Sequence, residues 1–261
     1  MSAAHDPVAL NHAFKERLRS GETVIGTFLG LGSPAAAEVC AAGGLDWVLL
    51  DLEHGAGSEA QIGEIVTRAA AYGAATLVRV EELRRIRLGR VLDTGAAGVM
   101  VPRVSSVEEV RDAASAMQYP PAGTRGVASY NRQARWSLDP AVLRRAGERH
   151  TRIVQIETRA ALDAVEEIAA EPGADVLFVG PQDLSYALGL PLQYEHPEFA
   201  AALDRVVAAA EAHGKAAGIL VMDPVVAERR REQGFRFIGI GSDASMLAAS
   251  SRAAAKVGGE R

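Results

Sequence analysis

Short apolar segments alternate with longer segments of helical character along the chain. The short segments are rich in Val, Ile, Leu and Phe, which is typical of buried β-strands. We expect strands at residues 23–29, 47–51, 76–80, 98–101, 152–156, 176–179, 216–220 and 237–240. The segments between them are rich in Ala, and helices are expected there at residues 58–72, 105–117, 159–170, 197–213 and 224–233.

Glycines mark the ends of several expected helices. Gly73, Gly95, Gly214 and Gly234 each stand shortly before an expected strand, where helices commonly end on a left-handed residue. Continuously apolar strands separated by helices indicate a parallel sheet with a covered outer face. Eight strand–helix units predict an α/β fold, a closed (β/α)8 TIM barrel, with an extra N-terminal helix at about residues 7–19.

An open doubly wound sheet is the alternative architecture. It is disfavoured because no GxGxxG motif follows the first expected strand. No linker or low-complexity tract interrupts the pattern, so we expect residues 1–261 to form a single barrel domain.

Composition narrows the classes of partner and compartment. The net charge of −5 gives no electrostatic basis for general nucleic-acid binding. Cys40 is the only cysteine, which excludes an intrachain disulfide and a thiolate zinc cluster. We see neither the apolar core of a signal peptide nor a membrane-length apolar run, and therefore expect a cytoplasmic protein without nucleic-acid or membrane partners.

Chemistry in such barrels lies at the carboxyl ends of the strands. Glu157 and Asp183 follow two neighbouring expected strands, and two carboxylates that converge there repel each other unless a proton or cation intervenes. Oxygen ligands with open positions suit Mg²⁺, Mn²⁺ or Co²⁺. The structural alternatives are a helix N-cap for Asp183 and a first-turn helix acid for Glu157.

The segment "VLLDLEHG" ends the second expected strand with a further polar group. His54 is the only histidine at a strand end and is a candidate general base, although a loop histidine bound by a neighbour is the simpler alternative. Asp51, one step inside, is positioned to orient this loop or the waters of a metal. Arg79 ends the third strand and is suited to stabilise a developing oxyanion; its structural alternative is a salt bridge to Glu157 or Asp51.

A Schiff-base mechanism is disfavoured because no lysine stands at an expected strand end. The chain has only Lys15, Lys215 and Lys256; the first and last lie in terminal helices, and Lys215 precedes the seventh strand at the opposite barrel end.

Several short motifs occur in a characteristic order. "DLEHG", "LVRV", "YPPAGTRG", "VQIET", "GPQDLS" and "GKAAGIL", found between about residues 26 and 243, resemble the HpcH/HpaI aldolase family. These are class II, metal-dependent pyruvate aldolases related to citrate lyase β-subunits. The resemblance implies a (β/α)8 barrel that reversibly cleaves a 4-hydroxy-2-oxo acid to pyruvate and an aldehyde.

The resemblance also implies functions for individual residues. His54 would be the base, Arg79 would stabilise the enolate oxygen, and Glu157 and Asp183 would hold the metal. Gln155 would contact the substrate, and the backbone N–H groups of Gln182 and Asp183 would receive the pyruvate carboxylate.

Asp93 matches a family residue that raises the basicity of the histidine. It ends a helix at the face opposite the loops, so it can reach His54 only from another subunit. The family forms homohexamers, trimers of dimers with exchanged C-terminal helices, which makes an intersubunit pair a reasonable hypothesis.

Departures from the family pattern leave the aldehyde open. Phe28 stands where relatives tend to carry Trp, and Gln182 replaces a smaller residue. A citramalyl- or malyl-CoA-type lyase and a non-catalytic oxo-acid-binding barrel are the alternative functions. The long segment 125–136 is expected to cover the site or pack between subunits, with Arg125, Arg132 or Arg135 available to meet a distal carboxylate.

Overall fold

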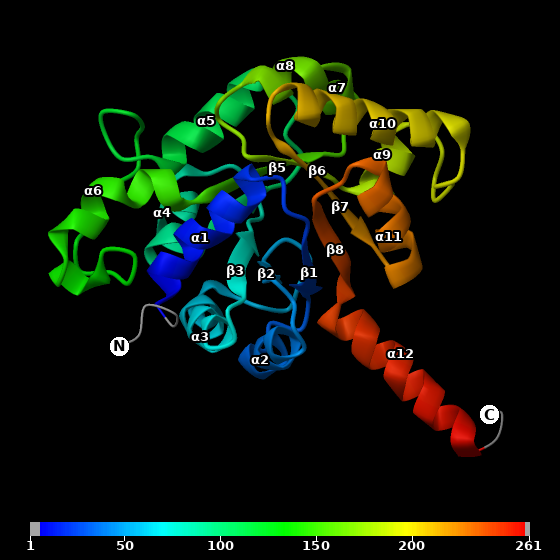
Figure 1. The fold of residues 1–261 in the computed structure, drawn as a ribbon, viewed down its shortest axis with the longest axis horizontal. Helices are drawn as coiled ribbons and strands as arrows, with labels where there is room; N and C mark the ends of the chain where they lie inside the picture. The colour runs from blue at the N-terminus through cyan, green and yellow to red at the C-terminus, as the bar shows by residue number, and fades with distance from the viewer. Residues whose placement is uncertain (1–5, 259–261) are drawn as a thin grey trace.

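A computed structural model describes residues 6–258, apart from the side chains of residues 144–148. Residues 1–5 and 259–261, which the expected single domain includes, lie outside the described residues. The strands form a closed parallel barrel in sequence order (Figure 1). They are β1 Val24–Leu29, β2 Trp47–Asp51, β3 Ala75–Arg79, β4 Gly98–Val101, β5 Thr151–Ile156, β6 Val176–Val179, β7 Ala216–Val221 and β8 Phe237–Ser242.

Helices surround the barrel, and one precedes β1. They are α1 Pro7–Arg19, α2 Pro34–Ala42, α3 Glu59–Ala70, α4 Arg85–Asp93, α5 Val107–Met117, α6 Pro140–Arg149, α7 Arg159–Asp163, α8 Val165–Ala170, α9 Pro181–Ala187, α10 Pro197–Ala212, α11 Pro224–Gln233 and α12 Asp243–Ala255. The (β/α)8 barrel and its extra N-terminal helix are therefore confirmed, and each expected strand agrees with the structure to within two residues. The helix expected at 159–170 is instead two helices, because Ala164 leaves the helical conformation with φ −100° and ψ 15°.

The four glycines expected to end helices adopt the conformation that this requires. Gly73, Gly95, Gly214 and Gly234 all have positive φ, between 63° and 114°. A side chain at φ values of this kind is strained, so glycine is the natural residue where the chain leaves a helix for the next strand.

Aromatic side chains fill the centre of the barrel. Trp47 and Phe237 stack with ring centroids 4.4 Å apart, and Phe28 and Phe178 pack beside them. Gly26 lies directly under Trp47: a Cβ atom there would come within 2.0 Å of the indole ring. The absence of a side chain at residue 26 therefore makes room for the largest side chain of the core.

Helix α1 closes the amino-terminal end of the barrel. Phe14 and Leu18 pack into the same aromatic core, and the buried Lys15 Nζ donates to the carbonyl oxygen of His150 at 2.6 Å and lies 2.9 Å from Asp175 Oδ2. Lys215 lies at this end too, where its Nζ donates to Ala174 O. With this end sealed by α1, the carboxyl ends of the strands are left for a binding site.

Helix α12 runs away from the barrel (Figure 1). Its apolar residues Met246 and Leu247 are exposed. Within residues 6–258, none of the helices combines the length and the apolar character that crossing a membrane requires.

The Gly26 contact gives a prediction for stability. Gly26→Ala should lower the free energy of unfolding by about 3 kcal/mol, because the added methyl group forces Trp47 out of its stacked position. Urea unfolding of wild type and variant measures this. Gly126→Ala is the matched control, since a Cβ at residue 126 meets no atom within 4 Å. Equal losses in the two variants would contradict the packing argument.

Candidate active site

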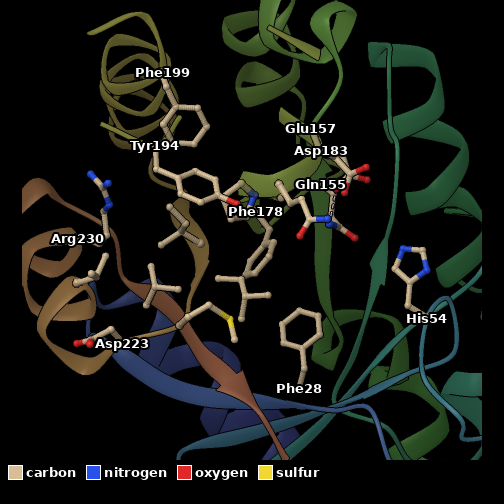
Figure 2. A pocket seen from close by; sticks show the side chains of 18 of the residues that line it. Phe28, His54, Gln155, Glu157, Phe178, Asp183, Tyr194, Phe199, Asp223 and Arg230 are labelled. Atoms are coloured by element: carbon tan, nitrogen blue, oxygen red, sulfur yellow. Dashed lines mark hydrogen bonds between the residues drawn. The ribbon is translucent and has the colours of Figure 1, made fainter. Parts of the chain in front are cut away.

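A cavity of about 380 Å³ opens at the carboxyl ends of the strands. Figure 2 shows Gln155, Glu157 and Asp183 close together on one side of it. Six of the candidate catalytic, substrate-binding and metal-binding residues line this cavity: His54, Arg79, Gln155, Glu157, Gln182 and Asp183. The fold therefore brings together residues that are far apart in the sequence: His54, after β2, and Asp183, after β6, are separated by 129 positions.

Arg79 is fixed by a two-pronged ion pair. Its Nε and Nη2 donate to the two carboxylate oxygens of Asp51 at 2.9 and 2.7 Å. The remaining nitrogen, Nη1, lies 3.1 Å from Glu53 Oε2 and 3.4 Å from Gln155 Oε1. The structural alternative for Arg79, a salt bridge to Asp51, is thus present, and it leaves one edge of the guanidinium facing the cavity.

Asp51 also holds the turn that carries His54. Its Oδ1 accepts hydrogen bonds from the N–H groups of Glu53 at 3.1 Å and His54 at 3.3 Å. Burial by itself would raise the pKa of Asp51, but the Arg79 guanidinium outweighs burial and lowers it. Asp51 is therefore a stable anion that fixes both the guanidinium and the loop after β2.

Glu157 is buried in a polar environment that also contains other acids. Its Oε1 accepts from the backbone N–H of Arg103 at 2.8 Å, and its Oε2 accepts from Gln155 Nε2 at 2.7 Å. Burial, together with the carboxylates of Asp183 and Glu53, raises the pKa of Glu157 to about 7 although the hydrogen bond from Arg103 lowers it. Glu157 thus carries a charge that the surrounding residues only partly stabilise.

The contact from Arg103 depends on an unusual backbone conformation. Arg103 lies just after β4 and has a φ of +53°, a left-handed value that residues other than glycine rarely adopt. Strained backbone of this kind is commonly found where it positions a functional group. Here it aims an N–H group at Glu157, and nothing in the sequence indicated this role.

The turn between β6 and α9 packs against Glu157. A Cβ atom at Gly180 would come within 2.1 Å of Glu157 Oε2, so only glycine allows this approach. Gly180 is the N-cap of α9, with Asp183 in its first turn, and Thr158 caps α7 just after Glu157. The two structural alternatives, an N-cap for Asp183 and a helix first-turn position for Glu157, are therefore wrong.

The two acids suit a divalent cation. Figure 2 shows Glu157 and Asp183 at the same end of the cavity, and their charges interact closely enough to raise the pKa of Glu157. Among residues 6–258, no three acidic, histidine or cysteine side chains are grouped as a metal site, so a cation here would be held by two side chains. A cation beside it would relieve the repulsion and leave coordination positions for substrate oxygens and water.

His54 lies at the rim of the cavity. Its side chain is 68% exposed, and its Nε2 is 3.9 Å from Glu53 Oε2. Glu53, for which the sequence suggested no specific role, thus stands between the guanidinium of Arg79 and the imidazole. The imidazole is not enclosed by the chain that carries it.

Asp93 does not join this group within one chain. It ends α4, and its Oδ1 accepts from Arg125 Nη2 at 2.6 Å. Arg132 lies over the ring of Trp136, and Arg135 forms an ion pair with Asp6. The expectation that one of these three arginines meets a distal carboxylate is therefore not met by the single chain, because none of them lines the cavity.

No pattern in the sequence indicated the opposite wall of the cavity. This wall comes from α11, from the start of α10 and from the segment between α9 and α10, and includes Tyr194, Phe199, Val226 and Arg230. These residues follow no strand directly, so the pattern of polar residues at strand ends does not indicate them.

The pKa of Glu157 gives a prediction for the cation-free protein. Between pH 4.5 and about 7 the folded chain keeps a proton on Glu157 that the unfolded chain has released. The free energy of unfolding should therefore fall as pH rises through this window, by about 2 to 3 kcal/mol from this residue alone. Urea unfolding with a chelator present, at pH 4.5 to 7.5, measures the fall.

Glu157→Gln should remove this component, while Glu108→Gln, a change at an exposed acid, should retain it. Identical pH profiles for wild type and Glu157→Gln would show that Glu157 is ionised throughout.

Comparison with known proteins agrees with the geometry. Residues 24–250 match the model of the HpcH/HpaI aldolase/citrate lyase family. A 4-hydroxy-2-oxo-heptane-1,7-dioate aldolase of Salmonella dublin is 36% identical over 254 residues, which are 97% of each chain. The crystal structure of a family protein from Burkholderia cenocepacia J2315 has a TM-score of 0.90 at 35% identity, covering 94% of this chain and 98% of that one.

An HpcH/HpaI aldolase from Desulfitobacterium hafniense DCB-2 is also similar, with a TM-score of 0.87 and 29% identity over 95% of this chain and 97% of that one. The family model spans nearly the whole barrel, and the Salmonella relative covers almost the whole chain. The chain therefore belongs to the HpcH/HpaI aldolase/citrate lyase family.

Proposed function

We propose that this protein is a class II pyruvate aldolase, a carbon–carbon lyase that reversibly cleaves a 4-hydroxy-2-oxo acid into pyruvate and an aldehyde. The observation that carries the proposal is the pair Glu157 and Asp183 beside a guanidinium that Asp51 holds in place. Relatives named as aldolases of a 4-hydroxy-2-oxo acid support the reaction class.

Glu157 and Asp183 would hold a divalent cation, Mg²⁺, Mn²⁺ or Co²⁺, which supplies Lewis-acid stabilisation of negative charge on the substrate. The backbone N–H groups of Gln182 and Asp183, in the first turn of α9, lack helical acceptors and would receive the substrate carboxylate. Gln155 is held by Glu157 at the floor of the cavity and would contact the same end of the substrate. These contacts fix the 2-oxo acid before any bond breaks.

His54 would remove the proton from the 4-hydroxyl group. The oxygen then forms the carbonyl of the departing aldehyde, the C3–C4 bond breaks, and its electron pair becomes part of the pyruvate enolate. Arg79 Nη1 would donate a hydrogen bond to the enolate oxygen, because its other nitrogens are committed to Asp51. Protonation at C3 then yields pyruvate, and the reverse sequence gives aldol addition.

We propose that the complete site needs a second copy of the chain. His54 is largely exposed, and Asp93, whose side chain is 31% exposed, is remote from the cavity of its own chain. Helix α12 runs away from its barrel with apolar side chains exposed, as an exchanged helix would (Figure 1). A homohexamer built from such dimers would place Asp93 of one chain beside His54 of another.

The base and the cation are tested by cleavage assays. His54→Ala should lower kcat for cleavage by about 10²- to 10⁴-fold, because proton removal then falls to water. His213→Ala, at an exposed histidine away from this cavity, should keep wild-type rates.

Exhaustive chelation should abolish cleavage, and added Mn²⁺ should restore it. Full activity in His54→Ala or after chelation would contradict the mechanism, and no turnover of any 2-oxo acid would favour a non-catalytic barrel.

The shared site is tested by complementation. His54→Ala and Asp93→Asn chains, each nearly inactive alone, should regain activity when they are unfolded together and refolded as mixed oligomers. A mixed dimer then contains one site with both native residues and one with neither. Mixed oligomers that remain as inactive as the parents, with mass spectrometry showing that the chains have combined, would rule out the intersubunit pair.

A further inference from the structure

A second cavity, of about 200 Å³, lies at the amino-terminal end of the barrel, at the edge of the helix that closes its centre. It is bounded by the last turns of α1, the starts of β5 and β6, and the turn between α10 and β7. A water molecule occupies about 30 Å³ in the liquid, so this cavity has room for a small polyatomic ion and a few further atoms. It is separate from the candidate active site, which lies at the opposite end of the strands.

Basic side chains dominate the lining of this second cavity. Four cations line it: Lys15, Arg19, Arg152 and Lys215. Among the described residues, Asp175 is the one acid that does so. Arg19 is exposed at the rim and pairs with Glu16, also on α1, at 3.1 Å. The three remaining cations and the single acid leave an excess of two positive charges.

Two of these cations share Asp175. Its Oδ2 lies 2.9 Å from Lys15 Nζ and 3.2 Å from Arg152 Nε. The side chains of Lys15 and Arg152 are only 1% and 11% exposed. Arg152 Nη1 donates to the amide oxygen of Gln118 at 2.8 Å, which is a neutral acceptor. One carboxylate therefore has to compensate two buried positive charges.

Lys215 is held by neutral groups. Its Nζ donates to the carbonyl oxygens of Glu171 at 2.8 Å and Ala174 at 2.5 Å. The carboxylate of Glu171 accepts from Arg111 Nε at 2.7 Å instead. Among the described residues, no carboxylate forms an ion pair with Lys215, and one of its three N–H groups is left for a ligand.

The pKa values of both lysines reflect this shortage of negative charge. Burial lowers the pKa of Lys15, Asp175 offsets this only in part, and Arg152 lowers the pKa further. Burial likewise lowers the pKa of Lys215, with a further contribution from Arg152. The fold thus buries positive charge that its own carboxylates do not fully compensate, and a bound anion would supply the compensation.

We propose that this second cavity is a binding site for a phosphate group, carried either by free phosphate or by a small phosphate ester. A phosphate dianion matches the excess of two positive charges. Its oxygens can accept hydrogen bonds from the ammonium groups of Lys15 and Lys215 and from the guanidinium of Arg152 together. The site is remote from Glu157 and Asp183, so this inference goes beyond the proposed aldolase function and does not depend on it.

Calorimetric titration of the full chain at pH 7.5, with a chelator present, tests the site. The probes are inorganic phosphate and glycerol 3-phosphate, and wild type should bind at least one of them; the tighter binder shows whether free phosphate or an ester is the source. Lys215→Gln should weaken this binding by about tenfold or more, because a charged hydrogen-bond donor is lost. Arg19→Gln should weaken it by about two- to fivefold, as expected for a charge at an exposed rim.

Each variant has a matched control. Lys256→Gln removes a lysine that follows α12, and Arg236→Gln removes an arginine just before β8 at the same end of the barrel; neither residue lines the second cavity. Both controls should keep the wild-type affinity. Arg79→Gln, which removes the guanidinium of the candidate active site, should keep it too. Thermal unfolding confirms that each variant is folded, and Arg19→Gln carries the test if Lys215→Gln is not.

The inference would be overturned if wild type bound neither probe, or if folded Lys215→Gln and Arg19→Gln both kept the wild-type affinity. Loss of binding in Arg79→Gln alone would place the phosphate at the carboxyl ends of the strands and would also overturn it. None of these results affects the cleavage assays, so the aldolase function is tested separately.

Discussion

At the open end of the barrel, the buried guanidinium of Arg79 interacts with three carboxylates, and a fourth carboxylate lies near two of them. Arg79 is paired with Asp51 through two nitrogens and lies 3.1 Å from Glu53, while Glu157 and Asp183 add two further negative charges. One cation cannot compensate four anions in a poorly hydrated cavity, so burial raises the pKa values of both Glu53 and Glu157. This excess of negative charge supports the proposed cation, which would also bind the oxygens of a 2-oxo acid.

Strand pairing prevents the acids from moving apart. Asp51 and Arg79 are direct partners in the register between β2 and β3. Ile156 and Val179 are partners between β5 and β6, so the residues that follow them, Glu157 and Gly180, leave the barrel side by side. Separating these charges would require breaking backbone hydrogen bonds within a closed sheet, which is far more costly than tolerating a raised pKa. The barrel therefore keeps the carboxylates close together despite their repulsion, and the proposed cation would bind between them.

Much of this arrangement follows from local sequence pattern. The strands were predictable because eight buried parallel strands leave continuous apolar runs, and the polar residues that end them fall at one rim in any closed barrel. Glu157, Asp183, Arg79 and His54 could be found in this way. Proximity along the rim is a property of topology, so a correct strand order was enough to assemble them.

Other features depend on geometry that the sequence does not encode locally. The N–H of Arg103 reaches Glu157 only because that residue adopts a left-handed conformation. Arg230 lines the cavity from α11, nine residues after the end of β7, so a pattern of polar residues at strand ends does not indicate it. The break at Ala164 likewise interrupts a segment whose composition favours one continuous helix.

The exposure of His54 brings these observations together. Asp51 and Glu157 are buried, whereas the side chain of the proposed base is 68% exposed. In contact with bulk water, an imidazole loses both its fixed orientation and its protection from competing proton donors. Both are restored if another chain covers the rim and supplies Asp93, a residue that its own chain keeps far from the cavity. On this view a single barrel provides the electrostatics of the reaction, and assembly provides its proton transfer.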